Sequence, residues 1–177
     1  NCVFADNYCH YWGGAVHCNN SSAVFSDCTF KENMSRTTGG GLYNRFSGIT
    51  LSHCQFVGNY ASYGGGMTSA YGSPAVKNSI FATNAANTAG GAIRNNDVSS
   101  IITNCTFFDN QAPAGGAVHN LLSEDTTISN CILWNNSNSE MEGDAEVTYC
   151  DVQGGWPGEG NIDADPCFAD SSEGDFH

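Results

Sequence analysis

Apolar and polar positions repeat along the chain with a period of 25 or 26 residues. In each repeat a small residue stands two positions before a Phe, and the residue between them varies from apolar to polar. Because residues two apart in a strand share a face, the small residue and the Phe are predicted to point inward. The small residues are Cys2, Cys28, Cys54, Ser79, Cys105 and Cys131, followed by Phe4, Phe30, Phe56, Phe81, Phe107 and, in the sixth repeat, Leu133.

Two further apolar columns complete each repeat. One lies three residues before the small residue, at Phe25, Leu51, Val76, Ile102 and Ile128, and this odd offset predicts a corner between two strands. The other closes a Gly-Gly signature, at Val16, Leu42, Met67, Ile93 and Val118. Strands this short share a core only by winding into a coil of stacked turns. The sequence therefore predicts an all-β right-handed parallel β-helix of six or seven rungs, with three short strands per rung.

An Asn follows three residues after each Phe or its Leu replacement. In a stacked coil these side chains would form a ladder, each amide bonding the next, at a corner where Asn tolerates left-handed backbone. The ladder comprises Asn7, Asn33, Asn59, Asn84, Asn110 and Asn136, and a partial second one comprises Asn44, Ser69, Asn95 and Asn120. The paired glycines predict turns with positive φ, or backbone that passes too close for a Cβ. We interpret all these columns as structural.

Composition favours a single extracellular domain. Residues 1–148 form the repeats, and residues 149–177 form a terminal rung with an acidic, Gly-rich tail of the same domain. The net charge of -13, with only five Lys and Arg residues, disfavours nucleic acid or an anionic membrane as a partner. No apolar run approaches membrane-spanning length, so membrane insertion is not expected. The chain begins within a repeat, which predicts that it is a piece of a longer protein.

The paired GGA-apolar and FxxN signatures of residues 1–136 resemble the repeats of polymorphic outer-membrane autotransporter adhesins. The tail, with Tyr149–Trp156 and Gly160–Pro166, is similar to the end segment of bacterial extracellular β-helix repeat proteins. The resemblance implies a secreted or cell-surface location and an adhesive or structural role. It transfers no catalytic residue.

Nine cysteines leave at least one unpaired within the chain. The column Cys2, Cys28, Cys54, Cys105 and Cys131 is predicted to be a reduced apolar stack, because in-register parallel strands aim their side chains side by side. Cys9 with Cys18 and Cys150 with Cys167 are the candidate disulfides, one at each end of the rod. The spacing of the cysteines and histidines fits neither a zinc site nor a haem attachment.

The sequence offers one weak pair of catalytic candidates. One position after each Gly-Gly signature is predicted to face outward. Arg94 and His119 occupy this position in adjacent rungs, so they should lie side by side. Hydrolysis of a glycoside requires two carboxylates, and a lyase requires a base with a cation; neither set is evident. The sequence therefore does not favour an enzyme, and Arg94 and His119 are interpreted first as solvated surface.

Aromatic residues suggest a sugar-binding edge. Tyr8 and Tyr60 are predicted to share one column, Tyr11 and Tyr63 another, and Trp12 adjoins them. The alternative is that these rings cover loop backbone.

Calcium is a possible cofactor, since three carboxylates of the tail offer hard oxygen ligands, against the alternative of simple solvation. They are Asp163, Asp165 and Asp170.

The N-terminus lacks an evident cap, which favours stacking of the first rung of one copy on the last rung of another. The alternative is that the rest of a longer polypeptide caps the ends. We thus predict a non-catalytic extracellular structural or adhesive β-helix that associates end to end into filaments. The alternative is a β-helix that binds carbohydrate or degrades polysaccharide. The expected partners are other copies of the chain, or host or cell-surface glycans or proteins.

Overall fold

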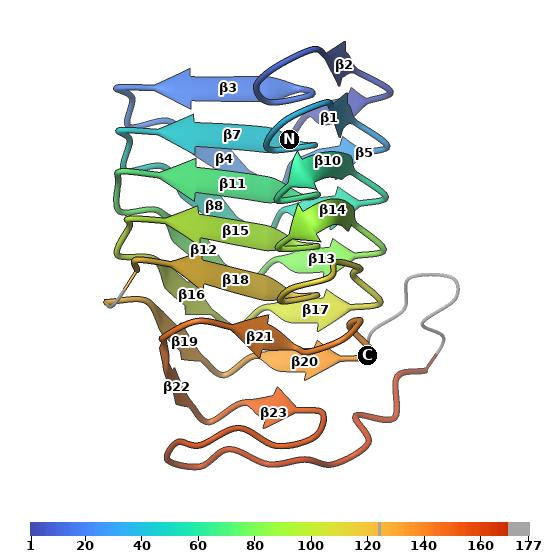
Figure 1. Ribbon diagram of the computed structural model, residues 1–177, viewed down its shortest axis with the longest axis vertical. Coiled ribbons are helices and arrows are strands. Elements are labelled where there is room, and N and C mark those ends of the chain that lie inside the picture. The colour runs from blue at the N-terminus through green and yellow to red at the C-terminus, as the bar shows by residue number, and fades with distance from the viewer. Residues whose placement is uncertain (124, 170–177) are drawn as a thin grey trace.

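The computed structural model of this chain describes residues 1–123 and 125–169. Within these ranges the secondary structure consists of short strands, stacked in parallel into four sheets, three of which wind around one core (Figure 1). Sheet A contains β1 (Val3–Ala5), β5 (Thr29–Lys31), β9 (Gln55–Val57), β13 (Ile80–Ala82), β17 (Thr106–Phe108), β20 (Ile132–Trp134) and β23 (Asp151–Val152). Sheet B contains β2 (Tyr8–Cys9), β6 (Met34–Ser35), β10 (Tyr60–Tyr63) and β14 (Ala85–Ala89).

The other two sheets have six strands each. Sheet C contains β3 (Val16–Asn19), β7 (Leu42–Arg45), β11 (Met67–Ala70), β15 (Ile93–Asn96), β18 (Val118–Leu121) and β21 (Met141–Glu142). Sheet D contains β4 (Val24–Ser26), β8 (Thr50–Ser52), β12 (Ala75–Lys77), β16 (Ile101–Thr103), β19 (Thr127–Ser129) and β22 (Glu146–Thr148). The parallel β-helix predicted from the repeat is thereby confirmed.

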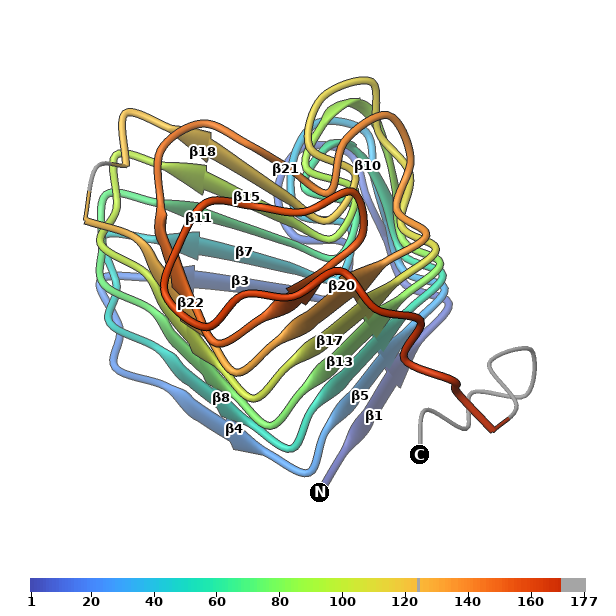
Figure 2. The same cartoon turned by 90° about the horizontal axis from the view of Figure 1, so that it is seen from below.

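Sheet B was not predicted. Sheets A, C and D carry the three apolar columns, whereas the strands of sheet B have two to five residues and no repeated apolar position. They follow the Asn column and, with their connections, form a lobe beside sheet C (Figure 2). We call this part the lobe. Because of the lobe, most turns of the helix have four strands instead of three. The lobe lies beside the main core and is not part of it.

The core is built from stacked identical residues. Phe30 pairs in register with Phe4 above it and Phe56 below it. Successive rings from Phe4 to Phe107 stack with centroids 4.4–5.2 Å apart and planes within 12° of parallel. Phe30, Phe56, Phe81 and Phe107 are fully buried, which gives each turn a large apolar contribution to stability.

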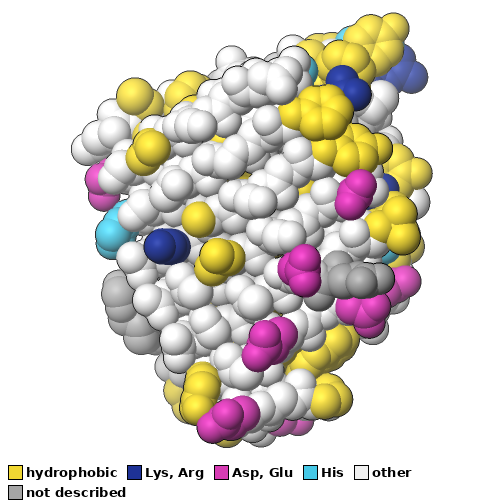
Figure 3. Space-filling view, turned by 90° about the vertical axis from the view of Figure 1, so that its left-hand side faces the viewer, with side chains coloured by type: hydrophobic (Ala, Val, Ile, Leu, Met, Phe, Trp, Pro, Cys, Tyr) yellow, Lys and Arg dark blue, Asp and Glu magenta, His cyan; other side chains and the backbone are white. Residues whose placement is uncertain are grey.

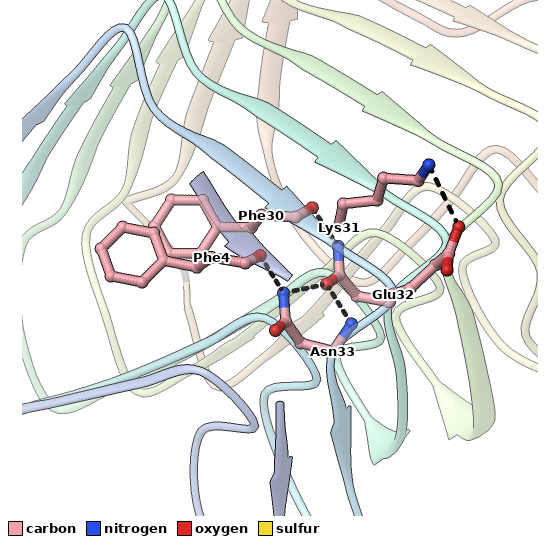
Figure 4. A network of polar contacts seen from close by, with 6 residues as sticks. Phe4, Phe30, Lys31, Glu32 and Asn33 are labelled. Carbon is pink, nitrogen blue, oxygen red and sulfur yellow. Dashed lines mark hydrogen bonds and ion pairs between the residues drawn. The ribbon is translucent and has the colours of Figure 1, made fainter. Parts of the chain in front are cut away.

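The Asn side chains form a continuous hydrogen-bonded ladder beside this stack. Figure 4 shows the part of it around Asn33. Each Nδ2 donates to Oδ1 of the Asn in the next turn at 2.8–3.0 Å, and each backbone N–H donates to that same oxygen at 2.9–3.1 Å. From Asn33 onward, Nδ2 also donates to a Phe carbonyl of the preceding turn at 2.8–2.9 Å. The ladder therefore pairs buried backbone groups that the sheets leave unpaired.

The two glycines of each signature have different reasons to be Gly. Gly64 has φ +60°, in the left-handed region that favours Gly. Gly65 does not, but a Cβ there would lie 2.4 Å from the carbonyl oxygens of Ala85 and Gly91. The first glycine thus turns the chain, and the second lets the lobe and the next turn approach.

The predicted disulfides are absent, and all nine cysteines are free. Cys150 is not at the edge of the fold, because its sulfur lies in the inward Cys column and accepts the backbone N–H of Cys131 at 3.4 Å. Cys167, its predicted partner, is exposed. Cys9 lies in sheet B, and Cys18 lies buried in sheet C. Burial raises the pKa of the Cys54 thiol, so this cysteine packs as a neutral thiol.

The two ends of the rod differ. At the first turn Phe4, Val16 and Phe25 are only partly buried. After β23 the chain folds back across the last turn (Figure 1), where Trp156 packs against the core. Ile162 then exchanges backbone hydrogen bonds with Cys150 and Val152, so this segment continues the stack. A copy stacking on this end would have to displace that segment.

Glu140 ends the Asn ladder. Its carboxylate accepts hydrogen bonds from the backbone N–H and the Nδ2 of Asn136, and the side chain is 7% exposed. Burial is the main cause that raises the pKa of Glu140 to about 7, although both hydrogen bonds oppose it. An ionisable carboxyl group therefore stands where the other turns have a neutral amide.

We predict that Glu140→Gln stabilises the fold above pH 7. The proton is held more tightly in the folded than in the unfolded chain, so the destabilisation by Glu140 is absent below about pH 4.5, grows as pH rises, and is complete above about pH 7. Gln offers one oxygen that can accept both donors, as each ladder Asn does. At pH 8 the variant should unfold with a free energy about 1–3 kcal/mol higher than the parent.

Urea unfolding measured from pH 4 to pH 8 checks this prediction. The difference in the free energy of unfolding between parent and Glu140→Gln should grow as the pH rises from 4.5 to 7. Glu146→Gln, which removes an exposed carboxylate from β22, is the matched control. Its free energy of unfolding relative to the parent should not change with pH. A constant offset for Glu140→Gln across the whole range would contradict the argument.

Candidate functional site

Two tyrosines lie in one column of the lobe, with Met34 between them. Tyr8 pairs with Met34, which pairs with Tyr60, so the two tyrosines share a column two turns apart. The predicted column of Tyr11 and Tyr63 is wrong: Tyr63 is in register with Thr38, and Thr38 with Trp12. The reason is the 25-residue third repeat, which is one residue shorter within the lobe and shifts the register of β10.

A shallow cavity of about 510 Å³ lies on the lobe beside Tyr60. Four successive turns contribute to it, with Tyr60 from β10, Asn87 from β14, and Gln111, Pro113, Ser137 and Asn138 from the connections that follow. The hydroxyl of Tyr60 donates to Oδ1 of Asn87 at 2.7 Å, which holds the ring in place. Asn138 Nδ2 donates to the carbonyl of Ala112 at 2.8 Å and fixes the opposite wall. We call this site the lobe cavity.

The lobe cavity combines one aromatic ring with uncharged polar groups. Asn87, Gln111 and Asn138 are exposed, so their amide groups can exchange water for the hydroxyls of a ligand. Tyr60 offers an apolar ring beside them. Such a mixture suits a ligand with hydroxyl groups and an apolar face.

A second set of polar residues runs along the outer face of sheet C. The parallel register aligns His17, Tyr43, Thr68, Arg94, His119 and Glu142, one residue per turn. At one end the rings of His17 and Tyr43 stack with centroids 5.1 Å apart, and Trp12 of the lobe lies 5.6 Å from His17. Further along, the Arg94 guanidinium carbon lies 4.6 Å from the ring centre of Tyr63. We call this set the sheet C row.

Arg94 and His119 are adjacent, as predicted from their repeat positions. Burial lowers the pKa of His119, the charge of Arg94 lowers it further, and Glu142 raises it. Burial also lowers the pKa of Arg94, while Tyr63 raises it. Both side chains contain a buried nitrogen without a hydrogen-bond partner, Nε in Arg94 and Nδ1 in His119.

Two of three comparisons with known proteins find nothing. No curated protein matches the chain, and no solved structure matches it. The sequence profile of the right-handed β-helix region family matches residues 1–154. This chain belongs to the right-handed β-helix family. The match covers all of sheets A to D and fixes the hand of the coil.

The chemistry that this β-helix presents differs between its two faces. Glu142 is the one carboxylate in the sheet C row, whereas glycoside hydrolysis with two carboxylates requires one on each side of the bond. The lobe cavity is lined by uncharged groups.

The corner between sheets C and D carries a ridge of exposed apolar residues that was not predicted from the repeat. Phe46 and Tyr71 lie there in successive turns, Asp97 takes the equivalent position in the next turn, and Leu122 follows in the turn after that. The three apolar residues have φ of 49–56°, and all three are exposed. Phe46 stacks on Tyr71 at 5.1 Å, and Arg45 lies 4.7 Å over Phe46. Hydrophobic side chains gather along one edge of the largely polar face in Figure 3. The recurrence of bulky residues after β7, β11 and β18 was the available signal.

Calcium binding by the tail stays a prediction. In residues 1–123 and 125–169 no three His, Cys, Asp or Glu side chains group closely enough to hold a metal ion. Asp163 and Asp165 are exposed, and a carboxylate oxygen of Asp165 accepts the Cys167 N–H at 2.9 Å. Asp170 lies outside the described residues. Nor does the described chain contain a helix with the length and hydropathy to cross a membrane.

The net charge comes from the C-terminal third of the sequence. Residues 1–120 contain five acidic residues and five Lys or Arg, whereas residues 121–177 contain thirteen acidic residues and no Lys or Arg. Arg94 and the aromatic residues of the sheet C row therefore lie in the electrically balanced part. An anion approaching them meets less repulsion than the overall charge of -13 suggests.

Proposed function

We propose that this β-helix is a non-catalytic extracellular protein with a structural and adhesive role, and that it binds a neutral saccharide in the lobe cavity. The observation that carries this proposal is the placement of Tyr60 against Asn87 within a cavity lined by further amides. An aromatic face packs against the apolar side of a pyranose ring, and amides bond its hydroxyls.

Rigidity supports an adhesive role. The cavity draws residues from four turns, and each turn is fixed by the stacked Phe rings and by the Asn ladder. A site that is already formed loses little conformational entropy on binding. The extracellular location rests on the resemblance of the repeats to adhesin repeats and on the acidic, Lys-poor composition.

End-to-end association is a separate proposal with less support. The first turn exposes part of its apolar residues, but the segment around Trp156 covers the opposite end. Stacking of copies thus requires that segment to move. Electron microscopy of the purified chain distinguishes filaments from short rods, and neither result bears on the lobe cavity.

A glycan array tests saccharide binding. The parent should bind at least one neutral saccharide, and Tyr60→Ala should weaken that binding at least tenfold, corresponding to about 1.4 kcal/mol. Tyr8→Ala removes the same residue type from the same column, two turns away from the cavity, and should leave binding unchanged.

Two outcomes would count against the proposal. One is an array on which no saccharide binds the parent. The other is equal loss of binding in Tyr60→Ala and Tyr8→Ala, which would assign recognition to the lobe surface in general and not to the cavity.

A further inference from the structure

We propose that two copies of this chain associate side by side, in opposite directions, through the corner between sheets C and D. The surface is formed by the residues that directly follow β7, β11, β15 and β18, namely Phe46, Tyr71, Asp97 and Leu122. We call it the corner ridge. It lies at the end of sheet C far from the lobe (Figure 2), so the proposal goes beyond saccharide binding in the lobe cavity.

The first argument is the exposure of the apolar side chains on the corner ridge. Phe46 is 46% exposed, Tyr71 45% and Leu122 76%. The rings of Phe46 and Tyr71 stack with centroids 5.1 Å apart, so they form one contiguous apolar surface. All three residues have positive φ, which is unfavourable for bulky side chains. Packing within the chain does not repay that cost, whereas burial against a second surface would.

The second argument is the order of charges along the corner ridge. Arg45 lies at one end, with its guanidinium carbon 4.7 Å from the ring centre of Phe46. Asp97 and Asp125 lie towards the other end, beside Leu122. Among the residues that the structure describes, none of these three charged groups forms an ion pair. A second copy in the opposite direction brings the cation of each copy to the carboxylates of the other.

A two-fold axis between Tyr71 and Asp97 makes the corner ridge complementary to itself. The four positions follow one another turn by turn, so this axis places Phe46 of each copy opposite Leu122 of the other. It also places Tyr71 opposite Asp97, where the phenol can donate a hydrogen bond to the carboxylate. Every contact occurs twice, as an interface between identical copies requires.

A cavity on the corner ridge can receive the group that this axis directs to it. The cavity has a volume of about 340 Å³, and Asp97, Leu122 and Asp125 are among its lining residues. The Phe46 ring of the second copy would contact the leucine. Arg45, which stacks on that ring, would bring a planar fork of N–H donors to the two carboxylates.

The distribution of net charge also favours opposite directions. Residues 121–177 contain thirteen acidic residues and no Lys or Arg, whereas residues 1–120 contain five of each sign. Two copies in the same direction would place their acidic ends side by side. Copies in opposite directions place each acidic end beside the balanced part of the other, which reduces the repulsion.

Sedimentation equilibrium of the parent chain and two charge variants tests the proposal. The parent should be a dimer at about 0.1 mM, with a dissociation constant of about 10 μM or below. Arg45→Glu and Asp125→Arg each set like charges opposite one another twice, so each should weaken dimerisation about a hundredfold. An equimolar mixture of the two variants contains both opposite-charge pairs again and should restore the dimer.

Phe46→Asn tests the apolar part of the corner ridge. Asn20 holds the equivalent position one turn earlier with φ 50°, so the variant should fold, as circular dichroism would show, and should be monomeric. Lys77→Glu on sheet D and Asp27→Arg at the corner between sheets D and A reverse exposed charges elsewhere and should stay dimeric.

Three results would overturn the proposal. A monomeric parent would leave the corner ridge to a partner of another kind. A dimer that survives Phe46→Asn would place the interface elsewhere on the chain. A mixture of Arg45→Glu and Asp125→Arg that stays monomeric would contradict the pairing of opposite charges across a two-fold axis.

Discussion

Asn84→Ala should destabilise the chain by about 4 kcal/mol or more, enough to unfold much of it at room temperature. The side chain is fully buried and accepts both the backbone N–H and the Nδ2 of Asn59. Its own Nδ2 donates to the carbonyl of Phe56 and to Asn110. The Ala variant leaves these partners buried and unpaired, at about 1–3 kcal/mol for each group. The total approaches the 5–15 kcal/mol that is usual for a whole domain.

Circular dichroism during urea unfolding measures this effect. Asn87→Ala is the matched control, since Asn87 lies three residues away, is exposed, and accepts one hydrogen bond from Tyr60. It should cost less than about 1 kcal/mol. Similar losses in both variants would mean that the ladder contributes no more than a surface amide.

Gly65→Ala should prevent correct folding altogether. A Cβ at this position would lie 2.4 Å from two backbone carbonyl oxygens, one in β14 and one in the Gly-Gly signature of the next turn. These oxygens belong to the backbone, which cannot move aside as a flexible side chain could. The strands β10 and β11, which flank Gly65, would therefore have to separate from their neighbours. We expect a loss of more than 4 kcal/mol, at the extreme of single substitutions.

Gly48→Ala provides the comparison, because the nearest atom to a Cβ there is 3.8 Å away and φ is not positive. This variant should be within about 0.5 kcal/mol of the parent or slightly more stable. Urea unfolding followed by fluorescence reports both. A folded Gly65→Ala protein with unchanged stability would show that the lobe does not depend on this close approach.

The repeat predicted the parts of the fold in which like residues stack. The Phe column, the apolar columns of sheets C and D and the paired glycines all recur at fixed spacing, and the parallel register aligns them as expected. The positions of residues could not be predicted where the repeat length departs from 25 or 26 residues. Cys150 follows Cys131 by 19 residues, so its place in the column was missed and a disulfide was assigned to it.

The candidate sites were harder to predict because the residues that form them do not repeat. The lobe cavity depends on the Tyr60 hydroxyl reaching Asn87 across a turn boundary, and on connections without a periodic pattern. Arg94 and His119 could be placed side by side from the sequence. The sequence could not place Tyr63 against Arg94, because the shortened third repeat moves Tyr63 out of the column of Tyr11.

Mapping a bound saccharide by NMR tests the central claim most directly. The ¹⁵N-labelled chain would be titrated with the neutral saccharide that binds best on the array, and the side-chain amide signals followed. We predict that the signals of Asn87, Gln111 and Asn138 shift together, whereas that of Asn104, an exposed amide at the corner between sheets D and A, stays in place. Shifts confined to residues outside the lobe cavity, or none at all, would contradict the account.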